Sequence, residues 1–363
     1  MPTLDITGVS KSYGNIHALE DVSLRVEDRE YVCIIGPSGC GKSTLIRCIS
    51  GIEQPTHGEI YVDGKSVKRT LIEDRQIGYV FQDIALFPHL TVRDNLAYGL
   101  VVRRTSTKET KTVTNEMLDL INLRDRSKSY PNELSGGAQQ KVAVGRAIAT
   151  GAHLFLLDEP LGALDAIVRA ELRYELRKLA SDLGLTVIHV THDQEEALSI
   201  ADRVVIMKSG RIIEVGTPAE IYHNPKTLFT ANFVGEANLL EGRVASLENR
   251  LCRVDIGGHL VNLPIHDIKV SEKVVIVIRP ESVVLTPRTG KGWLGTVKQV
   301  TFLGSLNRYV IDVGGIDIVS EVSTKEHSTG FGVGERVSLF LKEASMTMFQ
   351  YPEEGLEKEV ALE

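Results

Sequence analysis

Apolar and polar positions follow two different patterns along this chain, and the change falls near residue 235. Before it, short β-branched runs such as residues 32–35 and 187–190 alternate with stretches like 170–179, where apolar residues recur three or four apart. Short unbroken apolar runs are typical of buried strands, and the longer period is typical of helices. The alternation predicts α/β layering with a parallel sheet.

After residue 235 the chain consists of brief strand-like runs separated by Gly-rich turns. Examples are VVIVIRPESVVL, GWLGTVKQVTFLG and YVIDVGGIDIV. We therefore predict two domains, residues 1–235 and 236–363, the second a small β domain of the OB type. Periodicity does not choose between a barrel and a sandwich. Within the first domain, residues 88–150 are expected to form a semi-independent helical lobe inserted between strands.

Length and composition agree with this organisation. At ~150 residues per domain, 363 residues suffice for two, and 42% hydrophobic with 25% charged residues is the composition of an ordinary globular protein. No apolar run approaches the ~18 residues that a membrane-spanning helix needs. The N-terminal residues lack the pattern of a secretory signal, so we expect the protein to stay in the cytosol.

Charge and cysteine usage narrow the chemistry further. The formal net charge of -7 argues against broad nucleic-acid affinity, which depends on clustered Lys and Arg. The four cysteines, Cys33, Cys40, Cys48 and Cys252, have no metal-ligand spacing, and we expect all four to be thiols.

A glycine-rich stretch, GPSGCGKS at residues 36–43, follows a buried-strand run and precedes a helical one. Glycines let such a loop wrap so that successive N–H groups point at phosphate oxygens, and the helix dipole adds to the attraction. We expect Lys42 to reach the β- and γ-phosphates and the Ser43 hydroxyl to ligate Mg²⁺. The residues expected to bind ATP here are Gly36, Pro37, Ser38, Gly39, Cys40, Gly41, Lys42, Ser43 and Thr44.

Two adjacent carboxylates end a second apolar run, HLFLLDEP at residues 153–160. The carboxyl ends of strands are where α/β sheets place their ligand sites. Asp158 is expected to hold Mg²⁺, and Glu159 to polarise the water that attacks the γ-phosphate.

Many ATPase and GTPase classes share the glycine-rich loop and the carboxylate pair, and a third motif distinguishes among these classes. This motif is LSGGAQQ at residues 134–140, which lies between the other two along the chain. Three further residues accompany it: Gln82 in VFQD, Asp165 in LGALD and His192 in VTHDQEEA. On these motifs the first 235 residues resemble the ATP-binding cassette (ABC) family. The resemblance implies that two cassettes sandwich two ATP molecules, each P-loop facing the partner's signature sequence. The signature residues acting in trans would be Ser135, Gly136, Gly137 and Gln139.

The resemblance also assigns single residues. Tyr13 matches the aromatic that stacks on adenine, and Gln82 the residue that senses Mg²⁺ and the attacking water. His192 matches the switch histidine, which contacts the γ-phosphate and helps to hold the water and Glu159. Asp165 matches the D-loop acid that communicates across the dimer.

Three positions depart from the family pattern. Ala138 replaces a common Gln, Lys141 a frequent Arg, and Gly162 a common Ser. The signature serine, its two glycines and Gln139 remain, so activity is expected to survive.

The resemblance implies transport. Residues 236–363 look like the small β (TOBE) domain of bacterial and archaeal importers, with RPESV at 279–283. The chain would be the ATPase of an uptake transporter, a homodimer on two integral-membrane permease subunits at the cytoplasmic face of the inner membrane, fed by an extracytoplasmic binding protein. Phe87, Leu90 and Leu96 lie in the region that receives a permease helix in the family, although we expect at least half of them to belong to the lobe's own core.

The nature of the solute stays open. The phrases LGALDA, ALFPHLTV and FVGEANLLEG look closest to importers of polyamines, ferric iron and related ions, and sugar importers remain an alternative. A soluble cassette protein acting on DNA or ribosomes is a rival, although the paired cassettes or coiled-coil insertions of that class are not visible here. The β domain could also act as a regulatory sensor.

Cys40 suggests one smaller hypothesis. Beside Lys42 and a helix N-terminus its thiol pKa is expected to be lowered, which would make it sensitive to alkylation unless ATP covers it. The alternative is a small filler at a tolerant position.

Overall fold

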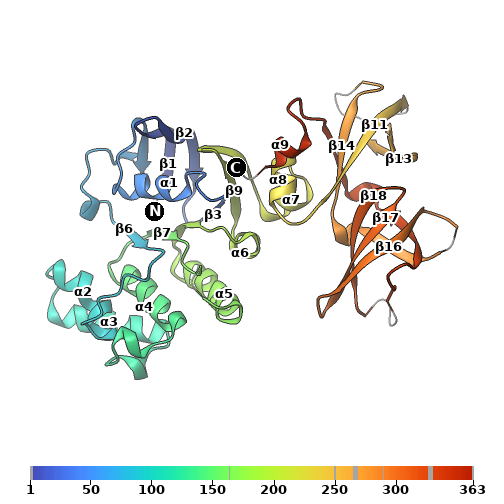
Figure 1. Ribbon diagram of the computed structural model, residues 1–363. Coiled ribbons are helices and arrows are strands. Elements are labelled where there is room, and N and C mark those ends of the chain that lie inside the picture. The colour runs from blue at the N-terminus through green and yellow to red at the C-terminus, as the bar shows by residue number, and fades with distance from the viewer. Residues whose placement is uncertain are drawn as a thin grey trace. The chain divides into compact units, whose positions relative to one another are not determined.

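The computed structural model describes residues 3–162, 164–248, 251–264, 269–288, 290–325 and 330–361, in two compact units (Figure 1). The first unit runs to Ala219 and the second begins at Glu220, earlier than the change of pattern near residue 235. The reason is visible in helix α8 (Leu228–Phe233), whose Leu228 and Ala231 pack against Val275 and Val277 of the second unit.

A six-stranded sheet is the centre of the first unit. Its strand order is β10-β9-β3-β8-β7-β6, and all neighbours except β9 and β10 are parallel. Strands β3, β7 and β8 are buried along their whole length, as expected for apolar strands covered on both faces. The strands are β3 (Tyr31–Ile35), β6 (Ile77–Val80), β7 (Leu154–Asp158), β8 (Thr186–Val190), β9 (Arg203–Lys208) and β10 (Arg211–Gly216).

A second, antiparallel sheet of the first unit has the order β2-β1-β4-β5. One hydrophobic core joins it to helix α1 and to the six-stranded sheet, and it includes Leu4, Leu24, Ile46, Val32 and Leu156. The elements added here are β1 (Leu4–Tyr13), β2 (Ile16–Val26), β4 (His57–Val62), β5 (Lys65–Ser66), α1 (Lys42–Ser50), α5 (Ala166–Leu183) and α6 (Gln194–Ile200).

A helical subdomain interrupts the first unit between β6 and β7 (Figure 1). It consists of α2 (Val92–Val102), α3 (Thr107–Leu120) and α4 (Gly136–Ala149). Each helix begins at a hydroxyl cap that accepts a hydrogen bond from a backbone N–H, namely Thr91, Ser106 and Ser135. A small core of its own holds it together: Val92, Leu96, Leu118, Ile121 and Val142.

The three apolar residues considered for a permease groove differ in burial. Leu96 is fully buried in the core of the helical subdomain. Phe87 and Leu90 are half-buried, and the Phe87 ring lies 4.2 Å from that of Tyr98, which is itself exposed. The exposed apolar surface in this region therefore comes from Phe81 and Tyr98 rather than from Leu96.

The second unit contains two five-stranded antiparallel sheets around one core. Their orders are β13-β12-β11-β14-β20 and β15-β19-β16-β17-β18. Buried and exposed residues alternate in strands such as β12, as expected for sheets with one face on a core and one in water. The shared core contains residues of both sheets, including Val254, Ile276, Tyr309 and Leu339.

The strands of this unit are β11 (Asn238–Glu248), β12 (Leu251–Ile256), β13 (His259–Pro264), β14 (Lys273–Ile278), β15 (Val283–Pro287), β16 (Trp293–Phe302), β17 (Leu306–Val313), β18 (Ile316–Ser323), β19 (Arg336–Leu341) and β20 (Met346–Gln350). The expectation of an all-β domain misses short helices that accompany them. These are α7 (Pro218–His223), at the division between the units, α8, and α9 (Leu356–Val360), which contacts α8.

Among the described residues, no helix combines the length and the apolar character that crossing a membrane would require.

Candidate functional site

The loops expected to carry chemistry leave one edge of the six-stranded sheet. The P-loop follows β3, Gln82 follows β6, Asp158 and Glu159 end β7, and His192 follows β8. These four strands belong to one parallel set, so their carboxyl ends meet at the same edge. This edge is where ligands bind in open α/β sheets.

The P-loop has glycines where a side chain would collide with neighbouring backbone. A Cβ on Gly36 would lie 2.2 Å from the carbonyl oxygen of Met207, and one on Gly41 would lie 2.4 Å from that of Ala18. Gly39, with φ of 79°, has no neighbouring atom within 4 Å of such a Cβ. The tip of the loop, Ser38 and Gly39, is exposed, whereas its base is held tightly against the sheet.

Lys42, the first residue of α1, directs its ammonium group back into the loop. Its Nζ donates to the carbonyl oxygens of Gly36 and Pro37, both at 2.8 Å, and the side chain is nearly buried. An ammonium has three donors, and two of them are used by these carbonyls. The backbone N–H groups at the start of α1 face the same loop, and together they form a site of positive potential.

The expectation of a lowered thiol pKa at Cys40 is wrong. Cys40 is buried, and this burial raises the pKa of its thiol, while Lys42 Nζ, 3.8 Å from Sγ, offsets the rise only in part. A thiolate would have to form away from water, which costs more than the nearby ammonium returns. All four cysteines are buried free thiols, as predicted.

Ser43 and Asp158 bring hydroxyl and carboxylate oxygens together. Ser43 Oγ donates to Asp158 Oδ1 at 3.2 Å. The other carboxylate oxygen, Oδ2, accepts a hydrogen bond from the hydroxyl of Tyr79 at 3.0 Å. Burial, and next the charge of Asp158, raise the pKa of Tyr79, so this hydroxyl stays a donor. The sequence argument missed Tyr79, and the available signal was its position on the strand that leads to Gln82.

Glu159 is the point where three loops converge. Its Oε2 accepts a hydrogen bond from Gln82 Nε2 at 3.2 Å and lies 3.2 Å from His192 Nδ1. The Glu159 backbone has φ of 46°, which is uncommon for a residue with a Cβ. Its N–H is anchored to the carbonyl oxygen of Val190 at 2.9 Å, so the carboxylate is held in place at some conformational cost.

The signature sequence forms the N-terminus of α4. The Ser135 hydroxyl caps the helix by accepting from the N–H of Ala138. A Cβ on Gly137 would lie 2.7 Å from Val168 Cγ1, so this glycine lets the start of α5 approach. The Gln139 amide donates to the carbonyl oxygens of Pro131 and Leu134, at 2.9 and 3.3 Å.

Two further residues that the resemblance assigned, Tyr13 and Asp165, lie on different elements of the first unit. Tyr13 ends β1 with its ring 43% exposed, and Lys11 Nζ lies 4.8 Å from the ring centroid. Asp165 caps α5 by accepting from the N–H of Val168 at 3.1 Å. Tyr13 is therefore free to stack on a planar ligand, and Asp165 has a structural task within its own chain.

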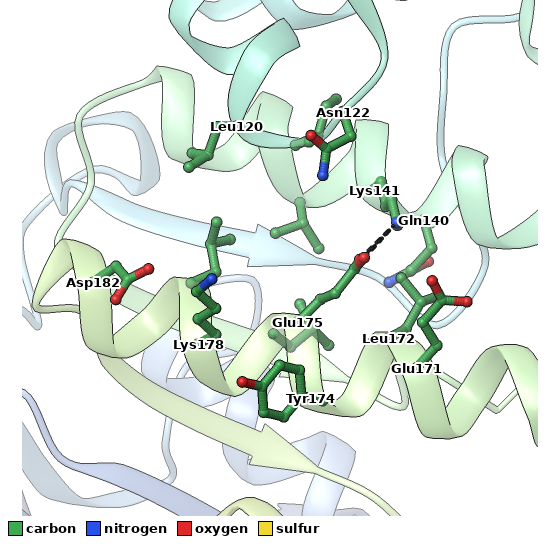
Figure 2. Close-up of a pocket in the computed structure, with 14 residues that line it drawn as sticks. Leu120, Asn122, Gln140, Lys141, Glu171, Leu172, Tyr174, Glu175, Lys178 and Asp182 are labelled. Atoms are coloured by element: carbon green, nitrogen blue, oxygen red, sulfur yellow. Dashed lines mark hydrogen bonds and ion pairs between the residues drawn. The ribbon is translucent and has the colours of Figure 1, made fainter.

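Two of the three departures from the family pattern are accommodated by their surroundings. Lys141 forms an ion pair with Glu175 of α5 at 2.7 Å, drawn as a dashed line in Figure 2. A Cβ on Gly162 would meet nothing closer than 3.5 Å, so the backbone there does not itself require glycine.

Arg279, the first residue of the RPESV motif, lies in the second unit and is only 6% exposed. Its guanidinium donates to four carbonyl oxygens, those of Tyr222, Ala231, Gly235 and Glu236, at 2.8–3.1 Å. It also covers the Tyr222 ring at 4.4 Å. The motif therefore fastens the segment that leads into the β domain.

The P-loop, the carboxylate pair and the signature helix define a P-loop ATPase of the cassette class. Comparison with known proteins agrees: residues 19–162 match the ABC transporter family, and residues 276–349 match the TOBE domain.

Similar proteins cover most of the chain. The sulfate/thiosulfate import ATP-binding protein CysA 2 of Chromobacterium violaceum is 46% identical over 313 residues, 84% of this chain and 82% of that protein. The spermidine/putrescine import ATP-binding protein PotA of Thermobifida fusca is 40% identical over 333 residues, 88% and 86% of the two chains. A dimeric ATP-binding cassette solved in a post-hydrolysis state with ADP and phosphate is 34% identical, with a TM-score of 0.54, and covers 59% of this chain and 98% of its own.

The chain belongs to the ABC transporter family. It is an ATPase subunit of the importer type with a C-terminal TOBE domain, and the predicted fold class is confirmed.

Proposed function

We propose that Glu159 is the general base of ATP hydrolysis, held by Gln82 and His192. The observation that carries this proposal is the convergence of both side chains on Glu159 Oε2, each at 3.2 Å. A carboxylate fixed by two neutral or cationic partners can accept a proton from water without losing its orientation. His192, whose side chain is 56% exposed, remains accessible to a γ-phosphate.

Ser43 and Asp158 are the residues that would hold Mg²⁺, with Gln82 as the third residue expected at the metal. Their paired oxygens suit a hard cation. Among the residues described, no three His, Cys, Asp or Glu side chains are grouped to bind a metal alone, so phosphate oxygens of ATP would complete the shell. When bound, the ion supplies charge neutralisation at the β- and γ-phosphates. Lys42 and the N–H groups of residues 38–44 bind the same phosphates, and Tyr13 stacks on the adenine.

The complete site requires two copies of the chain. Ser135, Gly136, Gly137 and Gln139 would face the γ-phosphate held by a partner's P-loop, and Asp165 would lie near the dimer axis. The support is the similarity to cassettes solved as dimers and the position of the signature at a helix N-terminus, which favours an anion. Two identical copies in an isologous pair satisfy both sites.

The dimer would drive solute uptake through two permease subunits at the cytoplasmic face of the inner membrane, with an extracytoplasmic binding protein delivering the solute. ATP closes the cassettes, hydrolysis releases them, and the permeases follow as a switch between two states. Similarity to sulfate/thiosulfate and spermidine/putrescine import proteins supports a small ion as the solute. Polyamines, ferric iron and oxyanions are the candidates, with sugars as the alternative.

Substitution Glu159→Gln tests the assignment. The variant keeps the size of the side chain and the contact to Gln82 but cannot take up a proton, so we expect ATP turnover to fall by about 10²–10⁴-fold. ATP affinity should stay unchanged, and the variant should accumulate as a closed dimer on size exclusion with ATP. Glu109→Gln, at an exposed site in α3, is the matched control. Undiminished turnover in Glu159→Gln would show that another group is the base.

The solute is tested in vesicles that contain the chain with its two permeases and binding protein. We expect stimulation of ATPase activity and tracer uptake by one small ion, with sulfate, thiosulfate, spermidine and ferric iron tested in parallel. Stimulation by a neutral sugar alone would contradict the ion assignment and leave the catalytic assignment intact.

A further inference from the structure

The strand that ends at Tyr13 carries a lysine two positions earlier. Side chains two residues apart on a strand share a face, and Lys11 and Tyr13 do so on β1. Lys11 Nζ lies over the Tyr13 ring, 4.8 Å from its centroid. Because the ammonium occupies one face of this ring, a planar ligand that stacks on Tyr13 has only the other face available.

The loop that follows α1 holds the Lys11 ammonium in place. Lys11 Nζ forms an ion pair with Glu53 Oε2 and donates to the carbonyl oxygen of Gln54, both at 2.9 Å. The hydrogen bond to Glu53 raises the pKa of the ammonium, so it stays charged at neutral pH. The lysine side chain is 13% exposed. Two partners and little contact with solvent distinguish this lysine from one on an open surface.

The same loop connects Lys11 to the helix of the P-loop. The N–H of Glu53 donates to the carbonyl oxygen of Arg47, in the last turn of α1, at 3.1 Å. Three residues further on, the N–H of Thr56 donates to the carbonyl oxygen of Ser10 on β1 at 2.8 Å. Lys11 therefore joins the aromatic residue expected to stack on the base to the helix expected to bind the phosphates.

This arrangement has two physical consequences for a base that stacks on Tyr13. A cation on one face of an aromatic ring draws π-electron density toward itself, which favours an electron-rich purine on the opposite face. A ring that is already ordered also loses less conformational freedom when the ligand binds. Both effects depend on Lys11 and act only on ligands that carry a base.

We propose that Lys11 is a positioning residue for the nucleotide base, which fixes the Tyr13 ring in one orientation and leaves a single face for adenine. The inference rests on the proposed stacking of adenine on Tyr13 and adds what determines the orientation of the ring. Lys11 acts through Tyr13 and not through the phosphates. Its removal should therefore weaken the binding of nucleotides and leave the binding of base-free phosphates unchanged.

Isothermal titration of the full chain with ADP and with inorganic tripolyphosphate, which has no base, tests the proposal. Lys11→Met keeps an unbranched side chain and removes the charge. We expect this variant to bind ADP about 3–10-fold more weakly than the wild type and to bind tripolyphosphate with unchanged affinity. Lys68→Met, at an exposed lysine paired with Glu59, is the matched control and should change neither affinity.

The two ligands distinguish a base-specific effect from a general one. Equal weakening of ADP and tripolyphosphate in Lys11→Met would show that Lys11 acts on the phosphate site or on the fold, and would overturn the proposal. Unchanged ADP binding would overturn it as well. Lys11→Arg retains a cation beside the ring and should bind ADP within about twofold of the wild type. A loss as large as that of Lys11→Met would contradict the proposal.

Tyr13→Leu separates this proposal from the stacking on which it rests. We expect Tyr13→Leu to weaken ADP binding by about 5–150-fold, and Lys11→Met to cause no further loss in that background. An equal loss from Lys11→Met with and without the Tyr13 ring would overturn the positioning role. Unchanged ADP binding in Tyr13→Leu would contradict the stacking itself, whereas a loss in Tyr13→Leu without one in Lys11→Met would overturn the role of Lys11 alone.

Discussion

Lys42 in the first unit and Arg279 in the second are both nearly buried cations that donate to main-chain carbonyl oxygens, and they differ in their surroundings. Lys42 is 5% exposed, and its Nζ donates to two carbonyl oxygens and lies 3.8 Å from Cys40 Sγ, a weak acceptor. Arg279 is 6% exposed and donates to four carbonyls, with its plane against Tyr222.

The difference separates a binding group from a structural one. The Lys42 ammonium lies in a loop whose tip is exposed to solvent and whose N–H groups can also bind an anion. Arg279 instead joins four backbone groups of one segment, residues 222–236, to the β domain. Buried charge alone therefore does not mark a functional site, and the position of the charge beside an exposed loop tip is the more useful guide.

The largest effect should follow from Lys42→Ala. Loss of a preorganised cation at the phosphates should reduce ATP turnover by about 10²–10³-fold, roughly 3–4 kcal/mol in the transition state, and weaken ATP binding. Thermal stability should also fall, because the carbonyl groups of Gly36 and Pro37 lose their donor, but by less than in Arg279→Met. Lys68→Ala, at an exposed lysine paired with Glu59, is the control for a lost positive charge. Normal turnover in Lys42→Ala would place this lysine with Arg279 among the structural cations.

Arg279→Met should act mainly on the stability of the protein rather than on ATP turnover. We expect the free energy of unfolding of the second unit to fall by about 3 kcal/mol, because one buried and three partly buried carbonyl groups lose their donor. Urea unfolding followed by fluorescence isolates this unit, since Trp293 is the single tryptophan of the chain. Arg308→Met, which breaks a surface ion pair with Glu236, should cost less than about 1 kcal/mol. Equal effects of the two substitutions would contradict the role given to Arg279.

The smallest effect concerns Cys40 beside Lys42. Because burial raises its pKa, the thiol stays protonated at pH 7 to 8, and labelling by iodoacetamide should be at least about tenfold slower than that of a free thiol. The rate should rise as the pH increases above 9, the usual value for cysteine, as the thiolate forms. Peptide mass spectrometry distinguishes Cys40 from Cys48, whose pKa burial raises to about 11. Rapid labelling of Cys40 at pH 7 would show that Lys42 dominates over burial.

The sequence predicts the P-loop well because its residue types stand together in one short stretch. Between a buried-strand run and a helical one lie Gly36, Gly41, Lys42 and Ser43, and the structure gives each of these four a steric or electrostatic reason. Ser135 was likewise predicted to stand at the start of a helix, and it caps α4. The cap that Asp165 provides for α5 was not predicted, since the resemblance assigned this residue only a role across the dimer.

Contacts between distant segments could not be derived from pattern alone. Gln82 and His192 meet Glu159 across 77 and 33 residues, and only resemblance to a family suggested that they act together. The partners of Arg279 are backbone carbonyls, which look alike at every position of a sequence. The thiol of Cys40 was misjudged because its burial depends on the fold around it. The position of α8 in the second unit likewise depends on apolar contacts that the local pattern does not contain.

The central claim is that each ATP is cleaved between the P-loop of one copy and the signature of another, and mixing two inactive variants tests it most directly. Lys42→Ala lacks the P-loop lysine, and Ser135→Arg blocks the signature, so each alone has no intact site. In a one-to-one mixture, half of the dimers carry one P-loop and one signature that are both intact and face each other. The account predicts recovery of up to about a quarter of the wild-type ATPase activity. Activity no greater than the sum of the two separate variants would contradict it.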